Sequence, residues 1–193
     1  MTLLIFDLDG TLVDCKALHQ VAFRNAVLQQ VPDAEFDDED VEGLPTTEKI
    51  KVLQSKGFPV TMELDKLKRD WTRQHIDSHI LFDPDLHSAI ARLDKQGKYK
   101  MAVCSNSRNE FVLKCLSILD LWQFDLVFSR DHGRPKPNPW MFQECMSITN
   151  TPAGDTYIFE DSPVGIQAAE ASGANVIEIL DSEDLIRILN SGF

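Results

Sequence analysis

Five short hydrophobic runs recur along the chain, and longer segments of mixed polarity separate them. The runs are nearly continuous rather than alternating in hydrophobicity, which is typical of strands that are buried on both faces of a parallel sheet. The pattern therefore predicts five strands in one parallel sheet. They are LLIFD near the start, KMAVCS at 100–105, DLVFS at 125–129, TYIFE at 156–160 and NVIEI at 175–179.

Helical patterns with recognisable ends fill the intervals between the later runs. Each begins with a residue that can cap a helix, and two of them continue with proline in the first turn and stop at glycine. These positions are Asp83, Pro84 and Gly97 for the first helix, Ser107 for the second, and Ser162, Pro163 and Gly173 for the third. Strand and helix alternate here, which predicts an α/β fold with a doubly wound, Rossmann-like parallel sheet.

The segment from residue 15 to residue 80 contains no convincing strand and has the pattern of helices only. Two stripes of apolar residues at helical spacing run through it. The first stripe is Leu18, Ala22, Phe23, Ala26 and Val27, and the second is Leu64, Leu67 and Trp71. We therefore predict a small all-helical cap at 15–80, inserted after the first strand, and a catalytic core formed by residues 1–14 and 81–193.

Composition limits the partners of the chain. Its 193 residues include 31 acidic and 19 basic side chains, a formal net charge of −12. Such a charge disfavours nonspecific binding to nucleic acid or to an anionic membrane, and no apolar stretch approaches the ~20 residues that span a bilayer. The four cysteines lack CxxC spacing and no signal peptide precedes the first strand, which predicts a cytoplasmic protein. We expect a monomer or a weak homodimer.

Two aspartates stand where the first strand ends, in the sequence Asp7-Leu8-Asp9-Gly10-Thr11. Ligands bind at the carboxyl ends of strands in open α/β sheets, and Gly10 allows the chain to turn there. An Asp-Gly pair by itself is more often a simple turn. Two neighbouring carboxylates repel each other, however, and a divalent cation removes that penalty. Oxygen ligands beside a phosphate suit magnesium.

A second carboxylate pair, Glu160-Asp161, ends the fourth strand. Such a pair is also compatible with a polar strand end or a helix cap. Because Ser162 and Pro163 already supply the cap and the first turn, Asp161 is left for a metal ion.

Polar groups follow the second and third strands as well. Ser105-Asn106-Ser107 presents hydroxyl and amide groups at a helix start, where backbone N–H groups can hold phosphate oxygens, although alone it would be interpreted as a helix cap. Lys136 lies in the sequence Arg134-Pro135-Lys136-Pro137-Asn138-Pro139. A lone loop lysine is usually solvated, but here the prolines hold it in place, as a counter-charge for phosphate requires.

These four elements, in this order and each after its strand, resemble the four motifs of the haloacid dehalogenase-like hydrolases. The resemblance covers essentially the whole chain, and the helical insertion is similar to the helical cap of that family. It implies an α/β core that transfers a phosphoryl group with Mg²⁺ as cofactor and a small phosphorylated metabolite as substrate. The presence of Asp9 disfavours dehalogenation, because the dehalogenase branch lacks that carboxylate.

The resemblance also implies a role for each motif residue. Asp7 would be the nucleophile that forms an aspartyl-phosphate, and Asp9 would protonate the leaving oxygen and then activate water. Asp7, the Asp9 carbonyl and Asp161 would hold Mg²⁺, with Glu160 in or just behind that shell, and Lys136 would neutralise the cluster. The phosphate and substrate contacts would come from Gly10 and Thr11 in the first loop and from Ser105 and the Asn106 backbone.

Substrate choice is expected to lie in the insertion. The segment from Glu42 to Thr47 is similar to the cap loop of the phosphoglycolate phosphatase and β-phosphoglucomutase branch, which makes Gly43 and Thr46 candidate substrate contacts. Thr46 is otherwise the N-cap of the next helix. Basic residues that the mutases carry there are missing, so a phosphomonoesterase acting on a sugar phosphate or phosphoglycolate is favoured. The alternatives are a phosphomutase and a catalytically idle relative that binds phosphate or a protein.

Overall fold

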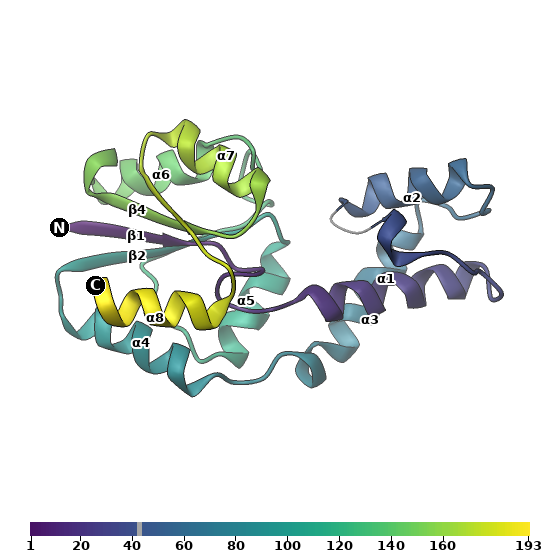
Figure 1. Ribbon diagram of the computed structural model, residues 1–193, viewed down its shortest axis with the longest axis horizontal. Helices are drawn as coiled ribbons and strands as arrows, with labels where there is room; N and C mark the ends of the chain where they lie inside the picture. The colour runs from purple at the N-terminus through teal and green to yellow at the C-terminus, as the bar shows by residue number, and fades with distance from the viewer. Residues whose placement is uncertain (42–43) are drawn as a thin grey trace. The chain divides into compact units, whose positions relative to one another are not determined.

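The computed structural model describes residues 1–41 and 44–193 and divides into two compact units. The core unit comprises Met1–Asp14 and Ile80–Phe193, and the helical unit comprises Cys15–His79. Figure 1 shows the chain coloured from its N-terminus to its C-terminus. The core elements are β1 (Thr2–Phe6), α4 (Pro84–Lys95), β2 (Tyr99–Cys104), α5 (Asn109–Ile118), β3 (Leu126–Phe128), α6 (Trp140–Thr149), η2 (Ala153–Asp155), β4 (Thr156–Glu160), α7 (Pro163–Ser172), β5 (Asn175–Glu178) and α8 (Ser182–Gly192).

The sheet of the core unit contains five strands in the order β3-β2-β1-β4-β5, and every pairing is parallel. The predicted α/β class with a parallel sheet is confirmed. β1 is central, and Phe6 near its carboxyl end lies in register with Val103 of β2 and Phe159 of β4. The residues that follow these three strands therefore emerge side by side at one edge.

Helices cover both faces of this sheet (Figure 1). α6 and α7 pack on one face, where ten fully buried residues from these two helices and from β1, β2 and β4 form a core. α4, α5 and α8 lie on the other face (Figure 1). Strands that are covered on both sides have no solvent-facing row, which explains why their sequences read as continuous hydrophobic runs.

Two of the three predicted helix starts are confirmed. Asp83 caps α4 with Pro84 in the first turn, and Ser162 caps α7, which ends at the left-handed Gly173. The cap predicted at Ser107 is wrong, because α5 begins at Asn109 and its N-cap residue, Arg108, makes no side-chain cap bond. The Asn109 N–H donates instead to Asp131, at 2.8 Å, so a carboxylate from a later loop serves this helix start.

The helical unit is built from α1 (Lys16–Gln30), η1 (Asp38–Asp40), α2 (Thr46–Ser55) and α3 (Leu64–His79), and its described residues include no strand. All five residues of the first predicted stripe are buried. The second stripe is only partly right: α3 buries Leu64, Thr72 and Ile76, whereas Leu67 and Trp71 are half-buried. The Trp71 ring stacks on His75, which keeps it at the surface of its own helix.

All four cysteines are buried free thiols. The thiols of Cys104 and Cys145 face each other at 3.5 Å beneath the end of β2. Within the described parts of the chain, no helix has both the length and the apolar character that a bilayer crossing requires.

Candidate active site

The predicted polar residues meet at the carboxyl edge of the sheet. Asp7 directly follows β1, Ser105 directly follows β2, and Asp161 directly follows β4. The backbone continues the strand pairing for one step at the first two positions, since the Asp7 N–H donates to Phe159 and the Ser105 N–H donates to Phe128. The sheet itself therefore aims these side chains into one site.

A buried ion cluster lies at the centre of this site. The Nζ atom of Lys136 is 2.5 Å from Oδ1 of Asp7 and also forms an ion pair with Glu160. All three side chains are nearly or fully excluded from solvent. Lys136 comes from the loop between β3 and α6, so the structure brings together residues that are 129 and 24 positions apart in the chain.

The Asn106 side chain holds the backbone of Lys136. Its amide group donates to the Lys136 carbonyl at 3.0 Å, and its carbonyl oxygen accepts from the Lys136 N–H at 2.8 Å. The Lys136–Pro137 peptide bond is cis. Only the backbone of Asn106 was expected to contribute to the site. The side-chain contact joins the loops after β2 and β3, and local sequence patterns carry no signal for it.

The cluster holds more acidic groups than basic ones, so negative charge remains to be compensated. Burial raises the pKa of Asp7 well above its usual range; Lys136 opposes this shift, and Glu160 and Asp9 add to it. Burial alone would lower the pKa of Lys136, but the adjoining carboxylates of Asp7 and Glu160 outweigh it and raise that pKa. Lys136 therefore stays charged. Burial also raises the pKa of Asp161 to about 6, with Glu160 contributing.

The acidic side chains fit a bound cation. Carboxylate oxygens of Asp7, Glu160 and Asp161 lie within 4.8 Å of one another. Oδ1 of Asp161 is buried and has no hydrogen-bond partner in the described parts of the chain, a costly state that a metal ion relieves. An all-oxygen donor set of this kind suits Mg²⁺. Glu160 is more fully engaged, because it accepts from Lys136 and from the Ser162 hydroxyl, at 3.2 Å in the latter case.

Two glycines leave the room that these carboxylates occupy. A Cβ atom at Gly10 would overlap the carboxyl group of Asp161, and the residue has φ +93°, which other residues rarely adopt. A Cβ atom at Gly165, in the first turn of α7, would overlap the carboxyl group of Glu160. Gly10 was predicted as a loop residue of the site, whereas Gly165 was not singled out.

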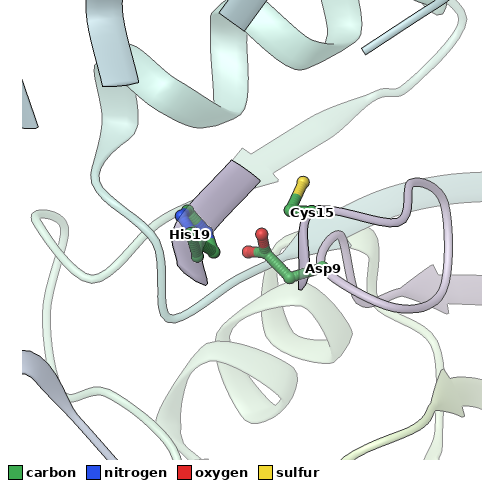
Figure 2. Close-up of side chains that lie close together, drawn as sticks. All are labelled: Asp9, Cys15 and His19. Carbon is green, nitrogen blue, oxygen red and sulfur yellow. The ribbon is translucent and has the colours of Figure 1, made fainter. Parts of the chain in front are cut away.

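Asp9 points toward the loop that follows β2. Its Oδ2 accepts from the Ser107 hydroxyl at 2.7 Å and from the Ser105 hydroxyl at a longer 3.4 Å. Figure 2 shows the Asp9 side chain extending from the loop after β1. The other two labelled residues belong to the helical unit: Cys15 is the N-cap residue of α1, and His19 lies in its first turn.

Three further residues were predicted for the site. Thr11 is fully buried and its hydroxyl has no hydrogen-bond partner among the described residues. Gly43 lies outside the described residues. Thr46 is the first residue of α2, and the N-cap alternative for it is wrong because Pro45 holds that position. Its hydroxyl instead accepts from Lys68 of α3, at 3.4 Å.

Comparisons with known proteins match nearly the whole chain. The family model described as haloacid dehalogenase-like hydrolase matches residues 4–179. The phosphorylated carbohydrates phosphatase of Thermotoga maritima is 28% identical over 190 residues, which cover 90% of this chain and 82% of that protein. The pyrophosphatase PpaX of Listeria innocua is 24% identical over 172 residues, covering 88% and 79% of the two chains.

Solved structures show the same fold. The crystal structure of a β-phosphoglucomutase from Clostridium difficile superposes with a TM-score of 0.74 at 21% identity, covering 96% of this chain and 87% of that one. At such low identity the likeness concerns the fold alone, because one fold hosts several activities.

Proposed function

Because the chain belongs to the haloacid dehalogenase-like hydrolases, we propose that it is a magnesium-dependent phosphatase that hydrolyses a small phosphomonoester through an aspartyl-phosphate. Membership of the family, and with it a hydrolytic enzyme whose relatives include phosphatases, is confirmed. The observation that carries the rest is the buried contact between Asp7 and Lys136 at the carboxyl edge of the sheet. A carboxylate is an effective nucleophile toward phosphorus only where positive charge balances the phosphate, and this contact supplies it.

Asp7 and Asp9 divide the proposed chemistry between them. An oxygen of Asp7 attacks phosphorus, the bond between phosphorus and the leaving oxygen breaks, and Asp9 transfers a proton to that oxygen. Asp9 then takes a proton from the water that attacks the aspartyl-phosphate, which releases inorganic phosphate and restores Asp7. A bound Mg²⁺ would supply charge stabilisation for the phosphate oxygens.

The chain's own residues would hold both ion and phosphate. Asp7, the Asp9 carbonyl and Asp161 are the proposed ligands of Mg²⁺. Glu160 is placed behind them, since it is already engaged by Lys136 and Ser162. Ser105 and the Asn106 backbone, with Gly10 and Thr11 in the first loop, are the proposed phosphate contacts.

The substrate class follows from the relatives. A phosphatase of phosphorylated carbohydrates and a pyrophosphatase are both similar to this chain over most of its length, so a sugar phosphate is the favoured substrate and pyrophosphate is the comparison to include. Residues 15–80 are proposed to act as a cap, with Gly43 and Thr46 as substrate contacts. A cytoplasmic location is part of the same proposal.

One observation favours a phosphomutase as the second candidate. Lys68 donates to the Thr46 hydroxyl, which places a cation beside the position where the mutases carry a basic residue. The local sequence around Thr46 gave no sign of this charge. A mutase would use it to hold a second phosphate, and its turnover would require an activating sugar bisphosphate.

Phosphate release from a panel of phosphomonoesters and pyrophosphate, with and without Mg²⁺, tests the proposal. The native chain is compared with Asp7→Asn and with Asp94→Asn, which changes an exposed carboxylate on α4. We expect release that depends on Mg²⁺, is lost in Asp7→Asn and persists in Asp94→Asn. Activity that survives in Asp7→Asn contradicts the nucleophile. Turnover of a sugar phosphate only when its bisphosphate is added, with little phosphate released, identifies the mutase.

A further inference from the structure

The loop after β2 places a hydroxyl against Asp9 that no expected role explains. The Ser107 hydroxyl donates to Oδ2 of Asp9 at 2.7 Å, across 98 positions of the chain. It does not cap α5, which begins two residues later with Arg108 as its N-cap. We propose that Ser107 is a positioning residue that fixes the orientation of the Asp9 carboxyl group during proton transfer. This inference rests on the proposed function.

Ser107 is better placed for this task than Ser105. The Ser105 hydroxyl is 3.4 Å from the same oxygen of Asp9, at the limit of a hydrogen bond. The Ser105 hydroxyl also accepts from the Ser107 N–H at 3.0 Å, so the backbone of Ser107 helps to orient the Ser105 side chain. The geometry therefore assigns the short, strong contact with Asp9 to Ser107.

The backbone around Ser107 is held from outside its own loop. Its carbonyl oxygen accepts from the Arg130 N–H at 3.2 Å, and Asp131 of that same segment caps the following helix. The loop after β2 is thus tied to the loop after β3 on both sides of Arg108. A hydroxyl on a segment fixed in this way can direct another side chain, because it loses little freedom in doing so.

The contact fixes Oδ2 of Asp9 toward the loop after β2. The Asp9 carboxyl group is then held in one orientation while it passes its proton to the leaving oxygen. Ser107 keeps its own proton throughout. In the step it assists, the bond from Asp7 to phosphorus forms, the bond to the leaving oxygen breaks, and the proton passes from Asp9 to that oxygen.

If Ser107 has this role, the activity lost by a Ser107 variant depends on the leaving group of the substrate. A nitrophenolate leaves readily without a proton, whereas an alkoxide needs one. We expect Ser107→Ala to lower kcat/KM for an alkyl phosphate such as glycerol phosphate by about 10- to 100-fold, and that for nitrophenyl phosphate by less than about 3-fold. The ratio kcat/KM is used because it covers only the steps up to release of the alcohol.

Three variants complete the experiment. Ser107→Thr keeps the hydroxyl and should restore most of the activity toward the alkyl ester. Ser117→Ala, at an exposed position of α5, is the matched control and should change neither ratio. If Ser107→Ala does not fold, Ser107→Cys is measured by the same criteria, since its thiol is a weak donor of similar size.

The outcomes separate this inference from the function on which it rests. Equal losses on both esters, no loss on either, or failure of Ser107→Thr to restore the alkyl activity would overturn the positioning role while leaving a phosphatase. A native chain that hydrolyses neither ester overturns the proposed function and the inference together.

Discussion

Lys136 lies between two buried carboxylates, and both depend on its charge. Its ammonium group contacts Asp7 and Glu160, and none of the three is appreciably exposed. Removing one partner of a buried ion pair leaves an uncompensated charge in a medium of low dielectric constant, which usually costs more than the pair contributes. Lys136, which supports catalysis in the proposed function, is therefore also needed for the stability of the site.

Replacing Lys136 should expose this dependence. We expect Lys136→Met, which keeps an unbranched apolar stem, to lower the free energy of unfolding by about 3–5 kcal/mol and to abolish phosphate release. Urea unfolding followed by circular dichroism measures the first effect. Lys95→Met, at an exposed position of α4, is the control. A loss of less than about 1 kcal/mol would show that the carboxylates do not rely on Lys136.

The raised pKa of Asp161 leads to a prediction about pH. The pKa of Asp161 in the folded chain, about 6, lies above the usual value of 3.8. Without a cation, protonation of Asp161 therefore stabilises the folded chain relative to the unfolded chain. This contribution is complete below the unfolded pKa and is lost as the pH rises through about 6. Mg²⁺ binds the ionised carboxylate and therefore competes with the proton.

Thermal unfolding with and without Mg²⁺ measures this competition. At saturating Mg²⁺ we expect the midpoint to rise by about 5–10 °C at about pH 7.5 and by much less at about pH 5. Asp161→Asn should remove most of the Mg²⁺ effect, and Asp94→Asn should keep it. A shift of equal size at both pH values would argue against Asp161 as a ligand.

At the scale of single elements, helix α7 shows how a local rule can be reversed by its surroundings. Alanine normally stabilises a helix relative to glycine by about 1 kcal/mol. Gly165 lies in the first turn of α7 against the Glu160 carboxyl group, which cannot withdraw because Lys136 and Ser162 hold it. Helix α7 can therefore pack this close to the end of β4 only because residue 165 has no side chain.

We expect Gly165→Ala to lower the free energy of unfolding by about 1–3 kcal/mol and to reduce phosphate release. Gly192→Ala, near the end of α8 with open space around it, should be neutral or slightly stabilising. Chemical unfolding of both variants gives the comparison. If Gly165→Ala is as stable as the native chain, Glu160 can move without cost.

The sequence predicts helices and strands well where most of their residues are buried. It predicts them less well where a residue's partner lies far away in the chain. β1, β2 and β4 are recognisable because most of their side chains are buried and apolar. Ser107 was misassigned as a helix cap because its partner, Asp9, is 98 positions away, and the cap of α5 comes from Asp131. In α3, Thr72 is buried in place of the expected Trp71, because packing within the helical unit outweighs hydrophobicity.

The candidate site was predictable to a similar degree. Motif residues at strand ends are found by position alone, since parallel strands end at one edge. The side chains that orient them, such as those of Asn106 and Ser107, act across loops that no local pattern connects.

At the scale of the whole molecule, the proposed Mg²⁺ ligands all come from one of the two units. Asp7, Asp9 and Asp161 belong to the core unit, and the helical unit has its own apolar core around Phe23, Ile50 and Leu53. A ligand protects from local opening the part of the chain that holds it. Mg²⁺ should therefore affect the two units differently.

Hydrogen exchange followed by mass spectrometry tests this difference. On addition of Mg²⁺ we expect exchange to slow by about 10-fold or more in peptides that contain β1, β2 and β4, and by less than about 2-fold in those from α1 and α2. Asp161→Asn serves as the control, because its core peptides should not respond. Equal slowing in both units would show that they open as one.

The central place of β1 in the sheet also governs how the chain can fold as it is made. β1 is made before the other described strands of the core unit, yet its partners are a strand that begins at Tyr99 and one that begins at Thr156. At about 5–20 residues per second, the second partner follows only after roughly 8–30 s. The helical unit, whose contacts are local, can form in that interval. β1, which directly precedes the proposed nucleophile Asp7, therefore stays exposed in newly made chains until its partners are made, and we expect chaperones to shield it.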